Sequence, residues 1–249
     1  MIINSTEMQN NFGKYLMLAA NEDIIITRNG APVAKLVGLQ RDYDVPTDTD
    51  TMSVKEEAPS IRTYPHFVKR ASYEQFLELT KGLEARYEYI DGAIYLQASP
   101  KTPHQVAVTE LLVQFYMSTE GTECRPFVAP YDITLKRSDK DVNVVQPDLM
   151  IICDLDEHLA DDGYYKGVPR LVVEILSDGT ARFDLIKKFD LYMSCGVSEY
   201  WVVDPEEQIV FIYGFENGKL IQQSTYKATG KAKSMVFPDL AVDLARVFR

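Results

Sequence analysis

Two acidic residues stand at or inside strongly apolar segments of this 249-residue chain. Asp148 follows Pro147 at the start of the segment PDLMIIC, and Glu174 lies in the middle of RLVVEIL. Because both segments are apolar at nearly every position, they are expected to form central strands covered on both faces. A carboxylate buried in such a strand is costly unless a positive charge or a hydrogen-bond donor compensates it. The pattern therefore predicts a partner for Glu174.

The helix predicted after the second strand supplies that partner. Asp184, Lys188 and Tyr192 recur at a spacing of four residues, so they share one helix face. If the two strands are neighbours, Asp148 and Glu174 converge and Lys188 reaches them from the helix. Paired carboxylates with a lysine suit phosphodiester hydrolysis assisted by Mg²⁺ or Mn²⁺, which take oxygen ligands and activate water. A purely structural salt bridge between Glu174 and Lys188 fits the same spacing.

The elements that must position these residues follow from hydrophobic periodicity and turn signals. From residue 64 onward, short apolar runs and amphipathic stretches alternate, which is typical of one α/β domain. The predicted helices span Ser72–Leu79, 104–118 and Asp184–Cys195. The predicted strands and hairpins are RYEYIDGAIYLQ with its turn at Asp91-Gly92, FVAPYDITLK, PDLMIIC, RLVVEIL, EYWVVD, and QIVFIYGFENGKLIQQSTY with its turn at residues 216–218.

Several segments match a known family in order. QPDLMII, LVVEILS, DLIKKFDLY and GVSEYWVVDP resemble the Uma-type endonucleases of the PD-(D/E)XK restriction-endonuclease-like superfamily, and RYEYIDG, SPKTPHQ and VAPYDITL extend the similarity upstream. The resemblance implies an α/β (α+β) fold with a mixed central sheet flanked by helices. It also implies that Asp148 and Glu174 bind Mg²⁺ or Mn²⁺, with Glu88 of RYEYIDG as a further acid and metal ligand.

One position departs from the superfamily pattern. The residue two positions after Glu174 is Leu176, where the pattern has a lysine. The resemblance implies that this branch carries its lysine on the following helix, where Lys188 matches. Lys187 is the second candidate, because it points about 100° away on a helix. His104, at the start of a predicted helix, is either a contact to a phosphate or water, or a helix cap.

Residues 1–39 carry a separate pattern. A helix is predicted over residues 5–20, and two short strands, Ile24–Thr27 and Val33–Val37, flank a turn at residues 28–30. So small a unit exposes much of its apolar face when alone, which predicts a homodimer. Residues 40–63 are polar and acidic without periodicity, which predicts a linker.

The first segment also resembles a known family. INSTEMQNNFGKYLMLAANEDIIITRNGAPVAKLVGL is similar to the N-terminal domain of Phd/YefM-type antitoxins, which implies a dimer that binds operator DNA and is followed by a toxin-binding segment. Lys14 and Arg28 are then the candidate phosphate contacts. Basic residues are few in this segment, so a dimerisation domain without a DNA role is the alternative.

Composition limits the classes of function. The formal net charge of -11 argues against a protein that coats nucleic acid, although carboxylates that hold a metal are compatible with a nuclease. No apolar run approaches the roughly 18 residues of a membrane span, and the N-terminus lacks a signal-peptide pattern. Cys124, Cys153 and Cys195 are odd in number and widely spaced, which predicts free thiols and a cytoplasmic protein.

Three functional hypotheses follow. The leading one is a Mg²⁺-dependent endonuclease domain over residues 64–249, fused to an antitoxin-like dimerisation domain over residues 1–39. The second is a regulator or partner-binding protein of a toxin–antitoxin-like system whose nuclease fold is inactive, which Leu176 favours. The third is a hydrolase of another phosphoester. Trp201 and Tyr200 in EYWVVDP are expected to pack in the core, with base stacking as the alternative.

Overall fold

The structure, a computed structural model, describes residues 2–4, 7–8, 15, 24–28, 31–36, 68–83, 85–97, 99–177 and 181–249. Side chains are not described at residues 28, 31–33, 68–69 and 181–185. The chain divides into two compact units, residues 1–61 and 62–249.

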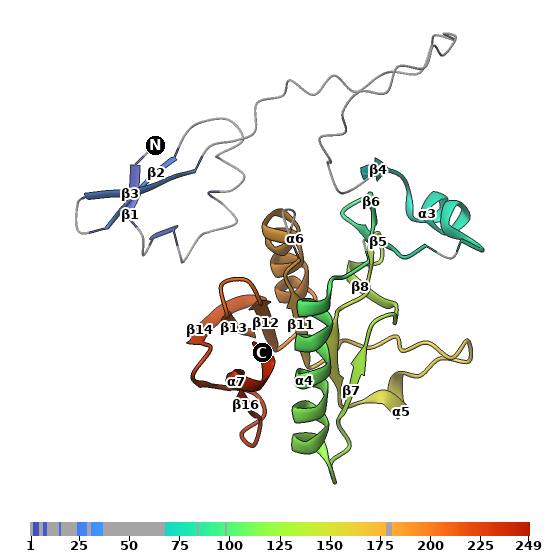
Figure 1. Cartoon of the computed structure of the whole chain (residues 1–249). Coiled ribbons are helices and arrows are strands. Elements are labelled where there is room, and N and C mark those ends of the chain that lie inside the picture. The colour runs from blue at the N-terminus through green and yellow to red at the C-terminus, as the bar shows by residue number, and fades with distance from the viewer. Residues whose placement is uncertain are drawn as a thin grey trace, which may run out of the picture. The chain divides into compact units, whose positions relative to one another are not determined.

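The first unit contains a three-stranded sheet in the order β1-β2-β3 (Figure 1). β1 (Ile2–Asn4) pairs in parallel with β2 (Ile24–Arg28), which pairs antiparallel with β3 (Ala31–Leu36). The predicted pair of strands is therefore confirmed, and β1 is a further strand that the pattern did not predict. Most of the predicted helix over residues 5–20, the linker over residues 40–63, Lys14 and the side chain of Arg28 lie outside the described residues.

Two larger sheets form the second unit (Figure 1). The six-stranded sheet has the order β14-β13-β12-β11-β10-β7, and the five-stranded sheet has the order β4-β6-β5-β9-β8. The six strands of the first are β7 (Arg125–Val128), β10 (Leu149–Ile152), β11 (Leu171–Ile175), β12 (Glu199–Asp204), β13 (Ile209–Glu216) and β14 (Lys219–Lys227). The five of the second are β4 (Val68–Arg70), β5 (Tyr87–Ile90), β6 (Ala93–Leu96), β8 (Ile133–Ser138) and β9 (Asp141–Val145). A separate pair consists of β15 (Lys231–Lys233) and β16 (Ala241–Asp243).

Helices cover these sheets in layers. They are α3 (Tyr73–Thr80), α4 (Thr102–Thr119), α5 (Leu155–His158), α6 (Ala181–Ser194) and α7 (Leu244–Val247). One core cluster joins α4 to the six-stranded sheet through residues such as Leu111, Leu149 and Val173. A second cluster holds alternate residues of the same strands, such as Val172, together with Tyr192 of α6 and the inner face of the five-stranded sheet. The six-stranded sheet is thus covered on both faces, as the apolar runs predict.

Local signals explain most boundaries. Ser72 and Gln75 form a reciprocal capping box at the start of α3. Asp91 and Gly92 adopt positive φ angles of 51° and 75° in the β5–β6 turn, a conformation that a two-residue hairpin favours. The predicted helix over Ser72–Leu79 and the predicted turn at Asp91-Gly92 are confirmed, as is the turn at residues 216–218, where Asn217 has a φ of 51°.

The prediction of one strand over FVAPYDITLK is wrong. The segment is divided between β7 in the six-stranded sheet and β8 in the five-stranded sheet. Pro130 lies between them and has no N–H to donate to a ladder, so pairing stops there and the chain passes from one sheet to the other.

The prediction of three free thiols is also wrong. Cys124 and Cys153 form a disulfide with an S–S distance of 2.08 Å, whereas Cys195 is free. The cause is strand pairing: Cys124 precedes β7, Cys153 follows β10, and the antiparallel register pairs Arg125 with Ile152. The two cysteines are 29 residues apart, and no local pattern indicates that these strands are neighbours.

Candidate active site

Lys188 joins two carboxylates that come from different sheets. Its Nζ lies 2.9 Å from Oε1 of Glu88 on β5 and 2.9 Å from Oε1 of Glu174 on β11. All three residues are buried, with exposed fractions of 2% for Glu88 and 7% for each of the other two. The ammonium therefore sits between the sheets and compensates two carboxylates that would each be costly alone.

Strand alternation explains how the acids meet. On β11, Val173 and Ile175 face α4, so Glu174 faces the opposite side with Val172. On β5, Ile90 faces the second core cluster, and Glu88 lies on the same side of that strand. The two carboxylates thus point into the layer that α6 occupies, where Lys188 meets both of them.

Asp148 reaches the same region from the beginning of β10. The neighbouring-strand prediction is confirmed, because β10 and β11 pair antiparallel with Leu149 opposite Val173. Asp148 Oδ2 accepts a 2.8 Å hydrogen bond from the backbone N–H of Ile175 and lies 3.1 Å from Nε2 of His104 on α4. These two contacts fix one oxygen of the Asp148 carboxylate beside Glu174. His104 Nδ1 is buried and has no hydrogen-bond partner among the described residues.

The pKa of Glu174 is shifted by burial and by the other acids near it. Burial raises the pKa of the Glu174 carboxyl to about 8; Lys188 and the Tyr192 hydroxyl lower it, whereas Asp148 and Glu88 raise it further. Tyr192 donates a 2.6 Å hydrogen bond to Glu174 Oε1. A cation near the free side of this carboxylate would favour its charged form.

For Lys188, the effect of the neighbouring charges on the pKa exceeds the effect of burial. Burial by itself lowers the pKa of the ammonium, but Glu174 and Glu88 together raise the pKa above its ordinary value. Lys188 is therefore charged across the physiological pH range. Tyr192 is neutral there, because burial and the nearby carboxylates raise the pKa of its hydroxyl.

Both oxygens of Glu88 are held by the protein. Oε1 accepts a 2.9 Å hydrogen bond from the backbone N–H of Gln146 in addition to Lys188, and Oε2 accepts a 2.8 Å bond from the side chain of Gln97. This arrangement directs Glu88 towards Lys188. Gln97 and Gln146 were not predicted as partners of Glu88, because nothing in the sequence sets them apart from surface glutamines and Gln146 contributes its backbone N–H.

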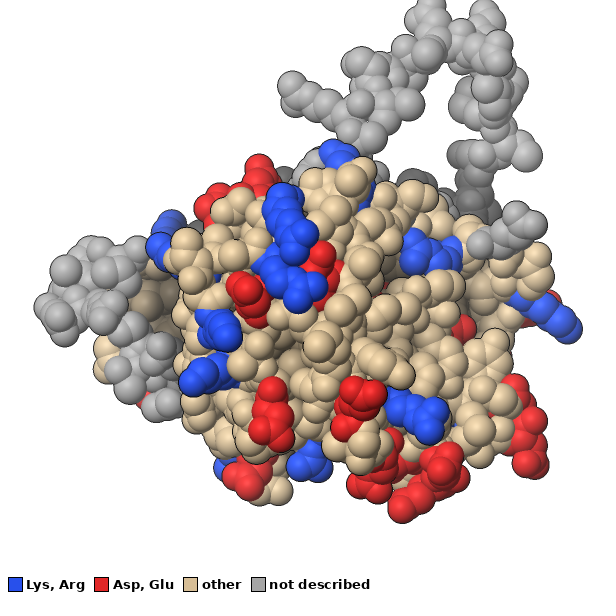
Figure 2. All heavy atoms as spheres, turned by 60° about the horizontal axis from the view of Figure 1, so that its bottom comes forward, with Lys and Arg blue, Asp and Glu red and all other residues tan. Residues whose placement is uncertain are grey.

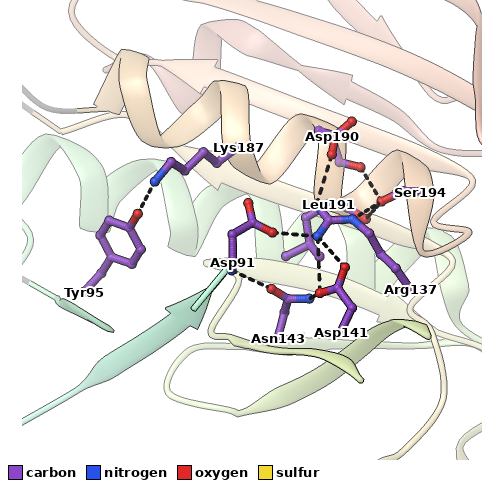
Figure 3. A network of polar contacts seen from close by, with 9 residues as sticks. All are labelled: Asp91, Tyr95, Arg137, Asp141, Asn143, Lys187, Asp190, Leu191 and Ser194. Carbon is purple, nitrogen blue, oxygen red and sulfur yellow. Dashed lines mark hydrogen bonds and ion pairs between the residues drawn. The ribbon is translucent and has the colours of Figure 1, made fainter. Parts of the chain in front are cut away.

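A second polar network positions α6 (Figure 3). The guanidinium of Arg137 on β8 contacts Asp91 of the β5–β6 turn at 2.7 Å and Asp190 of α6 at 3.0 Å, and it also reaches Asp141. Its Nε donates a 2.7 Å hydrogen bond to Ser194 at the end of α6. Arg137 thus ties α6 to the five-stranded sheet. Asp91, Asp190 and Ser194 lie 46 to 57 residues away in the sequence, so sequence spacing indicates only the pair with Asp141, four residues on.

The other residues singled out in the sequence lie around the site or in the core, except for Asp184, whose side chain is not described. Leu176 packs against the second core cluster on the face that Glu174 occupies, so an apolar side chain stands where the superfamily pattern has lysine. Lys187 donates a hydrogen bond to the hydroxyl of Tyr95 on β6 (Figure 3), whereas Lys188 contacts Glu88 and Glu174. Trp201 and Tyr200 are fully buried, which confirms their core role. The side chain of Asp184 is outside the described residues.

The donor atoms fit a hard divalent cation with two protein ligands. Among the described residues, Asp148 Oδ1 and Glu174 Oε2 accept no hydrogen bond, whereas both oxygens of Glu88 do. No group of three or more His, Cys, Asp or Glu side chains in this part of the chain is arranged to hold a metal. Mg²⁺ is commonly bound by one or two carboxylates, with waters and substrate phosphate as its other ligands. The residues present therefore fit Mg²⁺ or Mn²⁺.

The outer surface carries charges of both signs. On the face shown in Figure 2, Lys and Arg residues are interspersed with Asp and Glu and do not gather into one broad positive tract. This agrees with the net charge of -11. No helix in the described part of the chain has the length and apolar character needed to cross a membrane.

The layered sheets and the acids on paired strands define a restriction-endonuclease-like α+β fold. A solved structure supports this class: a protein from Anabaena variabilis, described as "a putative nuclease belonging to DUF820", superposes with a TM-score of 0.58. The match covers 72% of this chain and 97% of that one at 20% sequence identity, so it concerns the fold alone.

The chain belongs to the Uma2 family. Residues 73–245, more than half of its length, match the model of this family, which is described as "Putative restriction endonuclease". Residues 1–56 match the Phd/YefM antitoxin family of type II toxin–antitoxin systems. An uncharacterized protein from Synechocystis sp. is 28% identical over 123 residues, which cover 49% of this chain and 62% of that relative. The chain thus spans less than two thirds of that relative's length.

Proposed function

We propose that the second unit is a metal-dependent endonuclease that hydrolyses phosphodiester bonds of DNA. One observation carries the proposal: Lys188 lies within hydrogen-bond distance of Glu174, whose strand is paired directly with the segment that carries Asp148. A lysine between carboxylates, with one oxygen of Asp148 and one of Glu174 accepting no hydrogen bond from the described residues, suits phosphoryl chemistry better than a simple salt bridge does.

Each residue then has a distinct role. Asp148 and Glu174 would hold Mg²⁺ or Mn²⁺, which supplies phosphoryl polarisation and water activation when bound. Lys188 orients the attacking water or offsets charge in the transition state. Glu88, which the resemblance assigns to the metal, instead holds Lys188, because both of its oxygens bind protein donors. His104 orients the carboxylate of Asp148.

The first unit extends the proposal to the whole chain. Its match to Phd/YefM antitoxins supports a domain over residues 1–39 that dimerises and contacts DNA through Lys14 and Arg28, joined by the linker 40–63 to the nuclease domain 64–249. A two-fold dimer would let each active site address one strand of a duplex. A toxin partner would bind through the segment that follows the first domain.

A cleavage assay tests the proposed activity. Full-length protein is incubated with supercoiled plasmid or single-stranded DNA in Mg²⁺ or Mn²⁺, and wild type is compared with Glu174→Gln and Lys188→Met. Lys219→Met is the matched control, because Lys219 is exposed on β14, three strands away from β11. We expect both site variants to lose at least about 100-fold in rate and the control to cleave like wild type.

The alternative is a regulator whose nuclease fold lacks activity. Leu176 favours it, because the superfamily lysine is absent from that position. A wild-type chain that cleaves no nucleic acid, yet binds operator-like duplex DNA or a toxin, would support this alternative. Cleavage that is unaffected by either site substitution would refute the assignment of the site.

A further inference from the structure

The helix α4 lies on the outside of the second unit, with the six-stranded sheet behind it (Figure 1). Its inner face is buried in the core through residues such as Leu111 and Phe115. Val113 lies two residues from each of them, about 200° around the helix, and therefore points outward. Val113, Tyr116 and Met117 are 42%, 63% and 67% exposed. Because residues three and four apart are neighbours on a helix, these three side chains form one exposed apolar patch, a feature of interaction surfaces.

Charges of opposite sign lie at the two ends of this patch. One turn before Val113, the carboxylate of Glu110 binds both Arg246, at 3.0 Å, and Arg249, at 3.7 Å, so this end carries a net positive charge. Two turns after Val113, Glu120 is exposed at the C-terminal end of α4 and has no ion pair among the described residues. The C-terminal end of a helix is itself partly negative, and the last turn of α4 contains no basic residue. A cation from outside this unit would therefore stabilise Glu120.

A face with this charge distribution is complementary to a second copy of itself. When two such helices pack antiparallel across a two-fold axis, the negative end of each meets the positive end of the other. If Val113 of one protomer packs against Met117 of its partner, the same antiparallel count places Glu120 beside the end that carries Arg246 and Arg249. The apolar patches then meet at the centre. This two-fold match favours a second copy of the chain over a partner of unrelated sequence.

We propose that the outer face of α4 is an isologous interface between two copies of this chain, with the Val113–Met117 turns packed against each other and Glu120 of each protomer paired with Arg249 of its partner. The apolar centre supplies burial, and the charged ends select the antiparallel arrangement. The interface belongs to the second unit and is additional to the dimerisation proposed for residues 1–39. It does not depend on nuclease activity.

Chemical cross-linking of the full chain tests the interface. Met117→Cys is introduced together with Cys195→Ser, so that the disulfide-bonded Cys124 and Cys153 are the only other cysteines. In the proposed packing the two copies of position 117 are offset by only about 6 Å along the helix axes, because four residues of helix separate them. A short bismaleimide should therefore join most chains into covalent dimers at low protein concentration. Ile221→Cys in the same background is the control, because Ile221 is 62% exposed on the edge strand β14 and should couple little.

Charge reversal tests the pairing at the ends of the patch. Glu120→Arg and Arg249→Glu, each combined with Met117→Cys, place like charges at both ends of a symmetric dimer, and each should lower the yield of covalent dimer at least about fivefold. An equimolar mixture of the two variants should restore the yield, because opposite charges meet at both ends of the mixed dimer. A size tag on one variant identifies the mixed product. Glu216→Arg, an exposed position in the β13–β14 turn, makes the same change of charge and should have no effect.

Recovery in the mixture also excludes misfolding, since two misfolded variants would not restore each other. Little coupling of Met117→Cys, or equal coupling of Met117→Cys and Ile221→Cys, would overturn the interface. Coupling that neither charge reversal lowers, or a mixture that couples no better than its components, would overturn it as well. If another part of the chain or a different protein covers α4, Met117→Cys does not couple between copies and the inference fails, even in a chain that cleaves DNA. Restored coupling in a chain without cleavage would uphold the interface and refute the nuclease activity alone.

Discussion

The Lys188 ammonium on α6 lies 2.9 Å from Oε1 of Glu174 on β11, although the two residues are 14 positions apart. Leu176, which stands where the superfamily pattern has lysine, packs on the same face of the sheet as Glu174. The helix α6, and not the strand β11, therefore supplies the positive charge beside Glu174. Glu88 and Tyr192, which bond to Lys188 and to Glu174 respectively, make this geometry specific.

The first prediction concerns the buried charge balance. Lys188→Met leaves Glu88 and Glu174 buried without their shared cation, so the free energy of unfolding should fall by about 3–5 kcal/mol. Adding Glu88→Gln removes one of the two carboxylate charges and should recover part of this loss without restoring cleavage. Urea unfolding of the single and double variants measures the effect. Equal stability of Lys188→Met and wild type would contradict the ion cluster.

The second prediction concerns the Tyr192 hydroxyl. Tyr192→Phe removes the 2.6 Å hydrogen bond to Glu174 Oε1 and should cost about 1–3 kcal/mol of stability, because the acceptor stays buried. Tyr213→Phe is the control, since no hydrogen bond of its hydroxyl is found among the described residues. Thermal unfolding compares the two variants. The interpretation fails if both substitutions cost the same.

The third prediction concerns the support of α6 by Arg137. Arg137→Met removes three partly exposed ion pairs and the bond to Ser194, and we expect a loss of about 1–2 kcal/mol. Amide hydrogen exchange in the C-terminal half of α6 should become faster. Cleavage should slow, because Lys188 lies on that helix. Arg125→Met, at an exposed position on β7, should change neither. Unchanged exchange in α6 would show that Arg137 does not hold the helix.

The sequence predicted the central strands well because their apolar runs are long and uninterrupted. It also predicted that Lys188 and Glu174 meet, since a helix face and an adjacent buried strand leave few other arrangements. The role of Glu88 was harder to judge, because its partners Gln97 and Gln146 come from other segments. At Pro130 the chain passes from the six-stranded sheet to the five-stranded sheet. This crossing likewise depends on tertiary pairing, which local hydrophobic periodicity does not reveal.

The same reasoning explains the missed disulfide and the missed Arg137 network. Cys124 and Cys153 face each other only after β7 and β10 have paired. Arg137 contacts Asp91 in a turn and Asp190 on a helix, both distant in the sequence, in addition to Asp141 four residues on. Contacts of this kind follow from the topology and not from the spacing of residues along the chain.

The fourth prediction concerns pH and a buried acid outside the site. Burial raises the pKa of Glu199, although donors that include Trp201 and Ser234 lower it. The folded chain therefore binds more protons than the unfolded chain, in which a glutamate has a pKa of about 4.3. Stability from this group is fully present below that value and is lost as the pH rises through the raised folded pKa.

Glu199→Gln removes this titration and also weakens the bonds from Trp201, Met235 and Val236. The variant should be less stable at every pH, and its stability should fall less steeply than that of wild type as the pH rises above about 4. Urea unfolding at a series of pH values gives both curves. Parallel curves would show that Glu199 titrates alike in the folded and unfolded chains.

The most direct test of the central claim is the metal dependence of plasmid cleavage by the full chain. After dialysis against EDTA the wild type should be inactive, and Mn²⁺ or Mg²⁺ should restore nicking of supercoiled DNA with a saturable dependence on metal concentration. Asp148→Asn and Glu174→Gln should stay inactive at metal concentrations that saturate the wild type. Cleavage that persists in EDTA, or that Mn²⁺ restores equally in wild type and both variants, would contradict the proposed metal site.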